Sequence, residues 1–457
     1  MECNKIRDGT KHSVGNSDTM RRKLVRLALP MAFQQFMLAL VGASDAVMLG
    51  RLNQDAMSAV SLATQVTFVF NLFMMAFVIG ENMFVAQYYG KRDGRNIFRV
   101  LCLTLRTACG VSVLFWMGTL FFPENIMYFF TNDRELIALG SGYLRVVGCS
   151  YFLSAVAQVH MTVMKNCGAV NVSTTISGVT VILNILLNGV FIFGLLGVPA
   201  MGADGAALAT VLATFMQAAW SVAFVRKRIK MEGIGRKGRD GDLARRFWAK
   251  TTPVLLNELV WGGGFTMYSV IMGHMGTDAV AANSIANISK NLVICLCLGL
   301  GGAGSIIVGN ELGASRFEEA KEAGRMLTKA SMAGGVLSGL FLLALSPFIV
   351  RVVDLTPAAG GYLTGMLVIC SYYLIGKSVN SMTIGGIFPA GGDARFGLLC
   401  DAVTLWCIVI PFGCLCAFVW KLPVLTVYFV LSLDEIIKLP AVYRHYKKYG
   451  WLRNITN

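Results

Sequence analysis

Residues 50–61 read GRLNQDAMSAVS, and residues 273–284 read GHMGTDAVAANS. The two stretches share a glycine, an aspartate, two alanines and a serine at the same relative positions, and each lies between two long apolar runs. Glycine and aspartate favour a tight turn and the start of a helix, and small alanines let that helix pack closely against a neighbour. Both stretches are therefore predicted to be turns that join two long apolar helices.

The same shift of 223 residues, which carries Gly50 onto Gly273, relates further positions without a gap. The matched pairs are Arg22/Arg245, Pro30/Pro253, Val85/Val308, Gly90/Gly313 and Gly168/Gly391. Each match is weak by itself, but a constant offset over so long a register indicates an internal duplication. The chain is therefore predicted to contain two similarly folded halves.

The composition places both halves in a membrane. Hydrophobic residues make up 55% of the chain and charged residues 14%, whereas soluble proteins carry about 25% charged residues. Apolar runs of roughly 20 residues, the length of a bilayer-spanning helix, recur along the whole chain. These runs are continuous rather than alternating, which argues against a membrane barrel. The expected fold class is an all-α polytopic membrane protein.

Twelve transmembrane helices are expected, six in each half. The predicted spans are 24–49, 60–89, 98–122, 139–164, 171–196, 203–225, 247–272, 282–310, 325–350, 361–387, 395–419 and 422–443. Because six is even, both halves enter the membrane from the same side, and a pseudo-two-fold axis along the membrane normal relates two six-helix lobes. The predicted units are a tail 1–23, an N-lobe 24–225, a basic linker 226–246, a C-lobe 247–443 and a tail 444–457.

Basic residues are unevenly divided between the two sets of connections. Of the 40 Lys and Arg, only Arg51, Arg134, Arg145, Arg351 and Lys421 lie in or near one of the two sets of connections. By the positive-inside rule, both tails and the linker face the cytoplasm of a bacterial inner membrane. The net charge of +15 is then attracted to anionic lipid, and no nucleic-acid partner is expected. The polar stretch 1–23 lacks the apolar core of a signal peptide, so the first helix is expected to be retained.

An enzyme is a second class of protein that the residues argue against. Metal-dependent hydrolysis in a membrane would need converging acids or histidine ligands. No GxxxxGK[ST] stretch is present, so no ATP site is expected. The histidines are scattered along the chain, at His12, His160, His274 and His445.

Longer stretches of the chain resemble the multidrug and toxic compound extrusion (MATE) family. They are PMAFQQFMLALVGASDAVMLG at 30–50, NILLNGVFIFGLLGVPAMGADGAALAT at 184–210, PVLLNELVWGGGFTMYSVIMGHMGTDAVAA at 253–282 and GGDARF at 391–396. The ending WLRNIT at 451–456 is similar to the DinF-like bacterial branch. The resemblance covers nearly the whole chain. It implies a V-shaped pair of lobes that exports organic cations and other amphipathic compounds, driven by inward flow of Na+ or H+.

Polar side chains inside the first half are candidates for ion coupling. A charged group within a membrane span is costly and is by default functional, and Asp45 is such a group. The resemblance implies that an acid at this place binds a cation or a proton. Asn184 and Asn188 lie at i and i+4 on one helix face, and with the hydroxyl of Thr210 they offer oxygen ligands that suit Na+. The family often carries an Asp at Asn188, so Na+ and H+ both remain open, and helix packing by the amides is the alternative. Gln34 is a secondary candidate.

The second half holds its own buried charges. Glu258 lies roughly at the middle of its span. The resemblance implies a coupling role for a glutamate in this helix, but in the family that glutamate lies one helical turn after the position of Glu258. A buried lysine needs a carboxylate partner, so Lys290 and Lys377 are secondary candidates together with Asp401. We expect a Glu258–Lys290–Asp401 cluster whose pairings change with the transport state. The alternative is a permanent salt bridge from Glu258 to either lysine.

Other polar groups are expected to have structural roles. Glu81 is predicted to pair with Arg106, and Asp434 with Lys438 at i and i+4 on the last helix. The cavity between the lobes is expected to be lined by methionine and aromatic side chains, which adapt to varied substrates. The candidates for this lining are Phe33, Phe36, Met37, Met74, Met75, Trp261 and Met267.

The function predicted from these features is that of a secondary antiporter. It exports cationic or amphipathic organic compounds in exchange for Na+ or H+ by alternating access, and Pro30 and Pro253 permit bending near the starts of two helices. A lipid-linked saccharide flippase of the same superfamily is the alternative, and Lys290 and Lys377 are the only basic groups that would suit one. A small organic substrate and the lipid bilayer are the expected partners. The protein is expected to be a monomer and to need no cofactor beyond the coupling ion.

Overall fold

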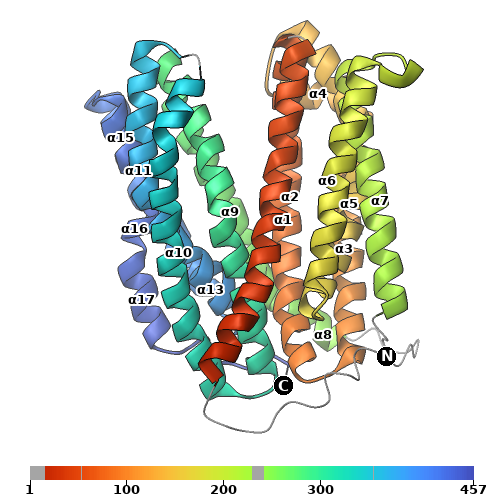
Figure 1. The fold of residues 1–457 in the computed structure, drawn as a ribbon, viewed down its shortest axis with the longest axis vertical. Helices are drawn as coiled ribbons and strands as arrows, with labels where there is room; N and C mark the ends of the chain where they lie inside the picture. Colours follow the sequence, from red (N-terminus) through yellow and green to blue (C-terminus); the bar gives the residue numbers. More distant parts are fainter. Residues whose placement is uncertain (1–15, 53, 229–240, 354, 457) are drawn as a thin grey trace.

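The computed structural model describes residues 16–52, 54–228, 241–353 and 355–456 (Figure 1). Most of the predicted tail 1–23 and of the predicted linker 226–246 lies outside these ranges. The described residues form helices and no strands. The connections 91–93, 167–169, 314–316 and 391–393 lie at one end of the helices, which we call the basic end.

The first half forms six long helices. They are α1 (Asn16–Leu52), α2 (Gln54–Gly90), α3 (Gly94–Phe121), α5 (Arg134–Asn166), α6 (Val170–Phe193) and α7 (Gly202–Arg228), with a short α4 (Pro123–Tyr128) and a 3-10 turn η1 (Leu195–Gly197) between them. Aspartates cap two of these helices: Asp93 accepts from Asn96 N, and Asp133 accepts from Glu135 N. The predicted turn at 50–61 is shorter than expected, because α2 already begins at Gln54.

The second half repeats this order with more irregular helices. Its regular helices are α8 (Gly241–Gly273), α9 (Thr277–Gly313), α10 (Phe317–Val352) and α11 (Pro357–Met382). α11 continues through the π-helical turn η2 (Thr383–Ile387) into α12 (Phe388–Ala390). The next span contains α13 (Ala394–Asp401), η3 (Ala402–Val409), α14 (Ile410–Cys414) and η4 (Leu415–Val419). The last span is broken into α15 (Val424–Leu431), α16 (Asp434–Ile437) and α17 (Leu439–Lys447). Such π-turns and breaks in membrane helices often mark functional positions.

Ten helical segments of the described chain are long and apolar enough to cross a membrane. The predicted spans that are not among them correspond to α8 and to the interrupted α15–α17. Charged residues explain both cases: α8 begins with several and contains Glu258, and the breaks of the last span surround Asp434, Glu435 and Lys438. The twelve-helix layout therefore consists of the ten segments together with these two.

The starts of α1 and α8 pack into the opposite half. Met20, Leu24 and Ala28 of α1 belong to an apolar cluster with residues of α9, α10 and α17. In return, Leu243 and Phe247 of α8 lie in the core of the first half. Figure 1 shows α1 leaning across from α9 at the basic end toward α2 and α6 at the other end. Each half thus contributes one helix start to the other's core.

The pseudo-two-fold axis passes between α2 and α9 near the basic end. Asn82 Nδ2 donates to Ser305 Oγ at 2.8 Å, and these residues are 223 positions apart, so a residue contacts its own repeat counterpart. A side chain added at Gly90 would collide with the backbone of Asn310. One added at Gly313 would collide with the backbone of Gln87, the counterpart of Asn310. The paired glycines let the two helices approach closely at equivalent points.

The segment 451–456 runs across the basic end and contacts both halves. Trp451 is fully buried and stacks on Tyr446. Gln87 of α2 donates to Arg453 O at 3.1 Å and accepts from Ile455 N at 2.8 Å. Asn454 Nδ2 donates to the carbonyl oxygen of Gly313, at the end of α9. This segment therefore ties α2 to α9 where the two halves meet.

Candidate functional site

The predicted polar site of the first half is assembled in the structure. Asn188 Nδ2 of α6 donates to Asp45 Oδ1 of α1 at 2.5 Å and lies 3.3 Å from Asn184 Oδ1. Asn184 Nδ2 is 3.4 Å from Thr210 Oγ1 on α7, and that hydroxyl donates to Ala206 O. One chain of hydrogen bonds thus joins three helices, in the part of the N-lobe farthest from the basic end.

The site has unused capacity to bind a cation or proton. Asn184 and Asn188 are buried, and Asn188 Oδ1 has no hydrogen-bond partner among the described residues. No described lysine or arginine forms an ion pair with the half-buried Asp45. A carboxylate without a countercharge and an unpaired amide oxygen are the ligands that a hard cation requires. The same carboxylate would be neutralised by a proton.

Gln34 lies apart from this site. Its Nε2 donates to Ser177 Oγ of α6 at 2.7 Å, and its side chain is buried. Eleven residues separate it from Asp45 on the same helix, which corresponds to roughly 16 Å along the helix axis. Gln34 therefore joins α1 to α6 at another depth. Tyr143 of α5, which sequence reasoning did not select, is the group on which the charge of Asp45 acts.

The second half contains a buried network of ion pairs. Lys377 Nζ lies 3.0 Å from Glu435 Oε1, and Asn380 Nδ2 donates to Glu435 Oε2 at 2.7 Å. Lys438 Nζ lies 2.8 Å from Asp401 Oδ1 and 3.4 Å from Glu435 Oε2. All of these groups are at least four-fifths buried, and they come from α11, α13 and the broken last span.

The predicted Glu258–Lys290–Asp401 cluster differs in this structure. Asp401 pairs with Lys438, the buried residue between α16 and α17. Lys290 Nζ instead lies 5.0 Å from the ring centroid of Tyr373, in a cation–π contact. Among the described residues, no ion pair joins Glu258 to Lys290 or Asp401. Glu258 is nevertheless near the network, since the charges of Lys377 and Asp401 act on it.

Acids outnumber lysines in this C-lobe network. The acids are Glu258, Asp401, Asp434 and Glu435, and the lysines are Lys290, Lys377 and Lys438. The predicted Asp434–Lys438 contact is present at 3.8 Å, with one Asp434 oxygen left unpartnered. The sequence analysis did not identify Glu435 as the partner of Lys377. The charged residues within the last apolar run indicated that this span carries buried polar groups.

Two other sequence predictions are wrong. Met74 does not line a cavity, because it is 1% exposed in the core of the first half. Glu81 does not meet Arg106, which is exposed on α3. Both oxygens of Glu81 are buried without a hydrogen-bond partner, and the charge that acts on it belongs to Lys165 of α5.

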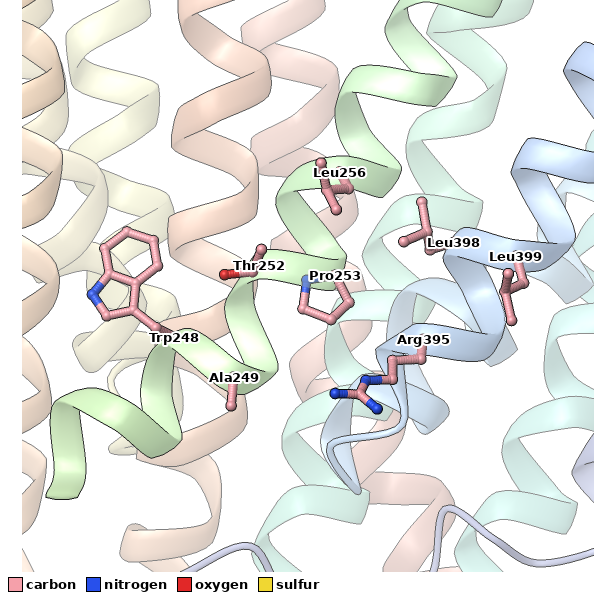
Figure 2. Close-up of a pocket in the computed structure, with 8 residues that line it drawn as sticks. All are labelled: Trp248, Ala249, Thr252, Pro253, Leu256, Arg395, Leu398 and Leu399. Carbon is pink, nitrogen blue, oxygen red and sulfur yellow. The ribbon is translucent and has the colours of Figure 1, made fainter.

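Two lateral crevices occupy equivalent positions in the two halves. One, of about 520 Å³, lies between α8 and α13, with Pro253 and Arg395 among its lining residues (Figure 2). The other, of about 450 Å³, lies between α1 and α6 beside Pro30 and Phe33. Both adjoin a helix proline, where the missing N–H permits bending. The crevices thus adjoin the two prolines, Pro30 and Pro253, at which the sequence predicts bending.

Comparison with known proteins identifies the family. The family model MatE matches residues 30–190 and 253–415, one segment in each half. A probable multidrug resistance protein NorM of Bradyrhizobium diazoefficiens is 28% identical over 433 residues, covering 90% of both chains. The multidrug resistance protein MdtK of Edwardsiella ictaluri is 24% identical over 404 residues, covering 87% of both chains.

Solved structures show the same fold. The chain superposes on a crystal structure of the Vibrio cholerae MATE transporter VcmN with a TM-score of 0.85 at 17% identity, covering 96% of this chain and 98% of that one. An outward-facing multidrug resistance MATE family transporter of the MOP superfamily gives a TM-score of 0.83 at 17% identity, covering 96% and 99%. The chain therefore belongs to the MatE family of multidrug and toxic compound extrusion proteins, and it is a multi-pass membrane transporter rather than an enzyme.

Proposed function

We propose that this transporter is a secondary antiporter that exports cationic or amphipathic organic compounds in exchange for Na+ or H+. The observation that carries the proposal is Asp45, a carboxylate without a described cationic partner that accepts a hydrogen bond from Asn188. Binding of an ion there must favour one arrangement of the lobes over the other, because only differential binding shifts a conformational equilibrium. The curated relatives named as multidrug resistance proteins support the substrate class.

The N-lobe site suits ion exchange better than the C-lobe network does. In the C-lobe, the ammonium groups of Lys377 and Lys438 already occupy the spaces beside the carboxylates. At Asp45, rotation of the Asn188 amide by half a turn would replace its N–H donor with an oxygen ligand. The same site could therefore hold a proton on Asp45 with the amide as donor to the other carboxylate oxygen, or Na+ with the amide turned.

We further propose that the basic end faces the cytoplasm of a bacterial inner membrane and that the protein works as a monomer. The concentration of Lys and Arg in the connections of that end supports this side. With this orientation the Asp45 site lies toward the external face. The flippase alternative is not favoured, since the relatives are named as multidrug resistance proteins and the lysines of the proposed cavity are occupied by acids or aromatic rings.

The test is efflux of a fluorescent organic cation from proteoliposomes under an imposed Na+ gradient or an imposed pH gradient. Wild-type protein should respond to at least one gradient, and Asp45→Asn should lose that response while it unfolds at a similar temperature. Asp55→Asn is the matched control, because Asp55 is an exposed acid at the same end of the molecule. Gradient-independent movement through the wild type would contradict antiport, and an unchanged Asp45→Asn response would exclude this site.

A further inference from the structure

A second ionisable pair lies in the N-lobe, far from Asp45. Glu81 is on α2, nine residues before the basic end of that helix, which corresponds to about 14 Å. Its side chain is fully buried, and neither carboxylate oxygen has a hydrogen-bond partner among the described residues. Lys165 lies near the basic end of the neighbouring α5. The proposed antiport leaves both groups unused.

Glu81 and Lys165 influence each other without forming an ion pair. Each is the one charged group among the described residues whose field acts on the other. Their charged atoms lie beyond the 4.0 Å limit of an ion pair. A carboxylate that lacks both a donor and a contacting cation is costly in a low-dielectric interior. In this conformation, no hydrogen bond or ion pair among the described residues stabilises the charged form of Glu81.

The other helices that pack against α2 bring no further charge to Glu81. From α8 and α9, neutral polar groups contact the two chain neighbours of Glu81: Thr251 lies against Gly80, and Ser305 bonds to Asn82. The titratable and charged groups on the surrounding helices act elsewhere. Among them are Asp45 of α1, Cys102 and Arg106 of α3, His160 of α5, Arg226 of α7, Lys250 of α8 and Glu311 of α9.

The residues that follow Glu81 and Lys165 in the chain are hydrogen-bonded to the contact between the lobes. Asn166, the residue after Lys165, donates to Asn82 Oδ1 at 2.7 Å. Asn82, the residue after Glu81, donates to Ser305 of α9 at 2.8 Å. A continuous chain of hydrogen bonds thus runs from α5 through α2 to α9, beside the two ionisable groups. Any separation of α2 from α9 breaks this chain of hydrogen bonds at Asn82, the residue next to Glu81.

The repeat shows that the scaffold does not require these charges. The positions equivalent to Glu81 and Lys165 in the second half are Gly304 and Phe388. Phe388 is fully buried, and Gly304 packs against Met382. The second half adopts the same fold with the apolar residues Gly304 and Phe388 at these positions. The charged residues of the N-lobe are therefore not needed for packing, which indicates that they have another role.

We propose that Glu81 and Lys165 form a proton-binding site at the basic end of the N-lobe, and that release of its proton is linked to separation of α2 from α9. With α2 and α9 in contact, Glu81 holds its proton. When they separate, water reaches the carboxyl, the proton leaves to solvent, and the carboxylate is stabilised by hydration and by Lys165. By linkage, high pH favours separation and low pH favours contact. This inference rests on the proposed function in one respect only, the orientation of the basic end toward the cytoplasm.

The experiment is hydrogen–deuterium exchange of the full-length protein in detergent, from about pH 5 to about pH 9, a range that brackets carboxyl groups perturbed by burial. The measured quantity is the protection of peptides from 82–93 and 305–316, normalised to the intrinsic exchange rate at each pH. Wild-type protection should fall as pH rises. Glu81→Gln should remove this dependence and stay protected throughout, because the amide cannot release a proton.

Lys165→Met keeps the proposal testable if Glu81→Gln does not fold. Without its cation, the carboxylate is less stable, so the midpoint of the change should move to higher pH by at least about one unit, whereas Lys165→Arg should restore the wild-type midpoint. Asp45→Asn, which should lose ion-driven efflux, should keep the wild-type pH response at α2 and α9. A wild-type pH response in Glu81→Gln, or an unshifted midpoint in Lys165→Met, would overturn the proposal whatever the efflux assays show.

Discussion

Replacement of Lys438 by methionine should strongly destabilise the C-lobe. The ammonium group lies 2.8 Å from Asp401 and 3.4 Å from Glu435, and it is almost fully buried. At an effective dielectric constant of about 20, these contacts correspond to about 6 and about 5 kcal/mol of attraction before desolvation. Part of this attraction is offset by the cost of burying the charges, so removal of one partner is expected to cost about 3–5 kcal/mol.

The assay is thermal unfolding of the purified protein in detergent at neutral pH. For a unit of about 200 residues, such a loss lowers the midpoint temperature by roughly 6–20 °C. Two controls isolate the cause. Lys448→Met removes an exposed lysine ten residues further along the chain and should change the midpoint temperature little. Asp434→Asn removes an acid from a network in which acids are in excess, and it should leave the midpoint unchanged or raise it.

A midpoint of Lys438→Met within about a degree of the wild type would refute this reasoning, because it would mean that desolvation cancels the attraction completely. A large loss in Asp434→Asn would refute the second part. In that case Asp434 would be a required partner of Lys438 at 3.8 Å, rather than the surplus acid.

Three further outcomes are expected. Gly313→Ala should lower stability by about 1–3 kcal/mol, because its methyl group meets the backbone of α2, whereas Gly273→Ala, which has open space around it, should not; midpoint temperatures compare the two. Trp451→Ala should lower stability by about 3–5 kcal/mol and expose 451–456 to proteolysis, which mass spectrometry of the fragments detects. Asn188→Leu should weaken Na+ affinity at least about tenfold by removing the amide oxygen that would bind the ion, measured as the Na+ gradient needed for half-maximal efflux.

The layout of the helices could be predicted from the sequence because it depends on local properties. Apolar runs of sufficient length must be helical in a bilayer, and a constant shift between matching residues implies two related halves. The N-lobe site was predictable for a similar reason. Asn184 and Asn188 share a helix face by their spacing alone, and Asp45 is a charged group within a predicted span, for which the resemblance to a known family also implies an ion-binding role. Thr210 was named as a further oxygen ligand.

The C-lobe network and the partner of Glu81 depend on how helices are rotated against each other, which a single sequence does not show. Arg106 and Lys165 both lie on helices that pack against α2, but only the charge of Lys165 acts on Glu81. Lys377 and Glu435 are 58 residues apart on different spans. Glu435 lies in the short α16 of an interrupted span, so a regular helical periodicity over the whole span could not place it.

The exchanged starts of α1 and α8 have a consequence for the origin and assembly of the molecule. Two unfused copies of a six-helix ancestor that made these contacts would have formed a swapped homodimer, with each subunit completing the interior of the other. Joining them into one polypeptide would have required no new packing, only a connecting segment. It follows that neither half has a complete interior by itself. The two halves should recover a native structure only when they are synthesised together.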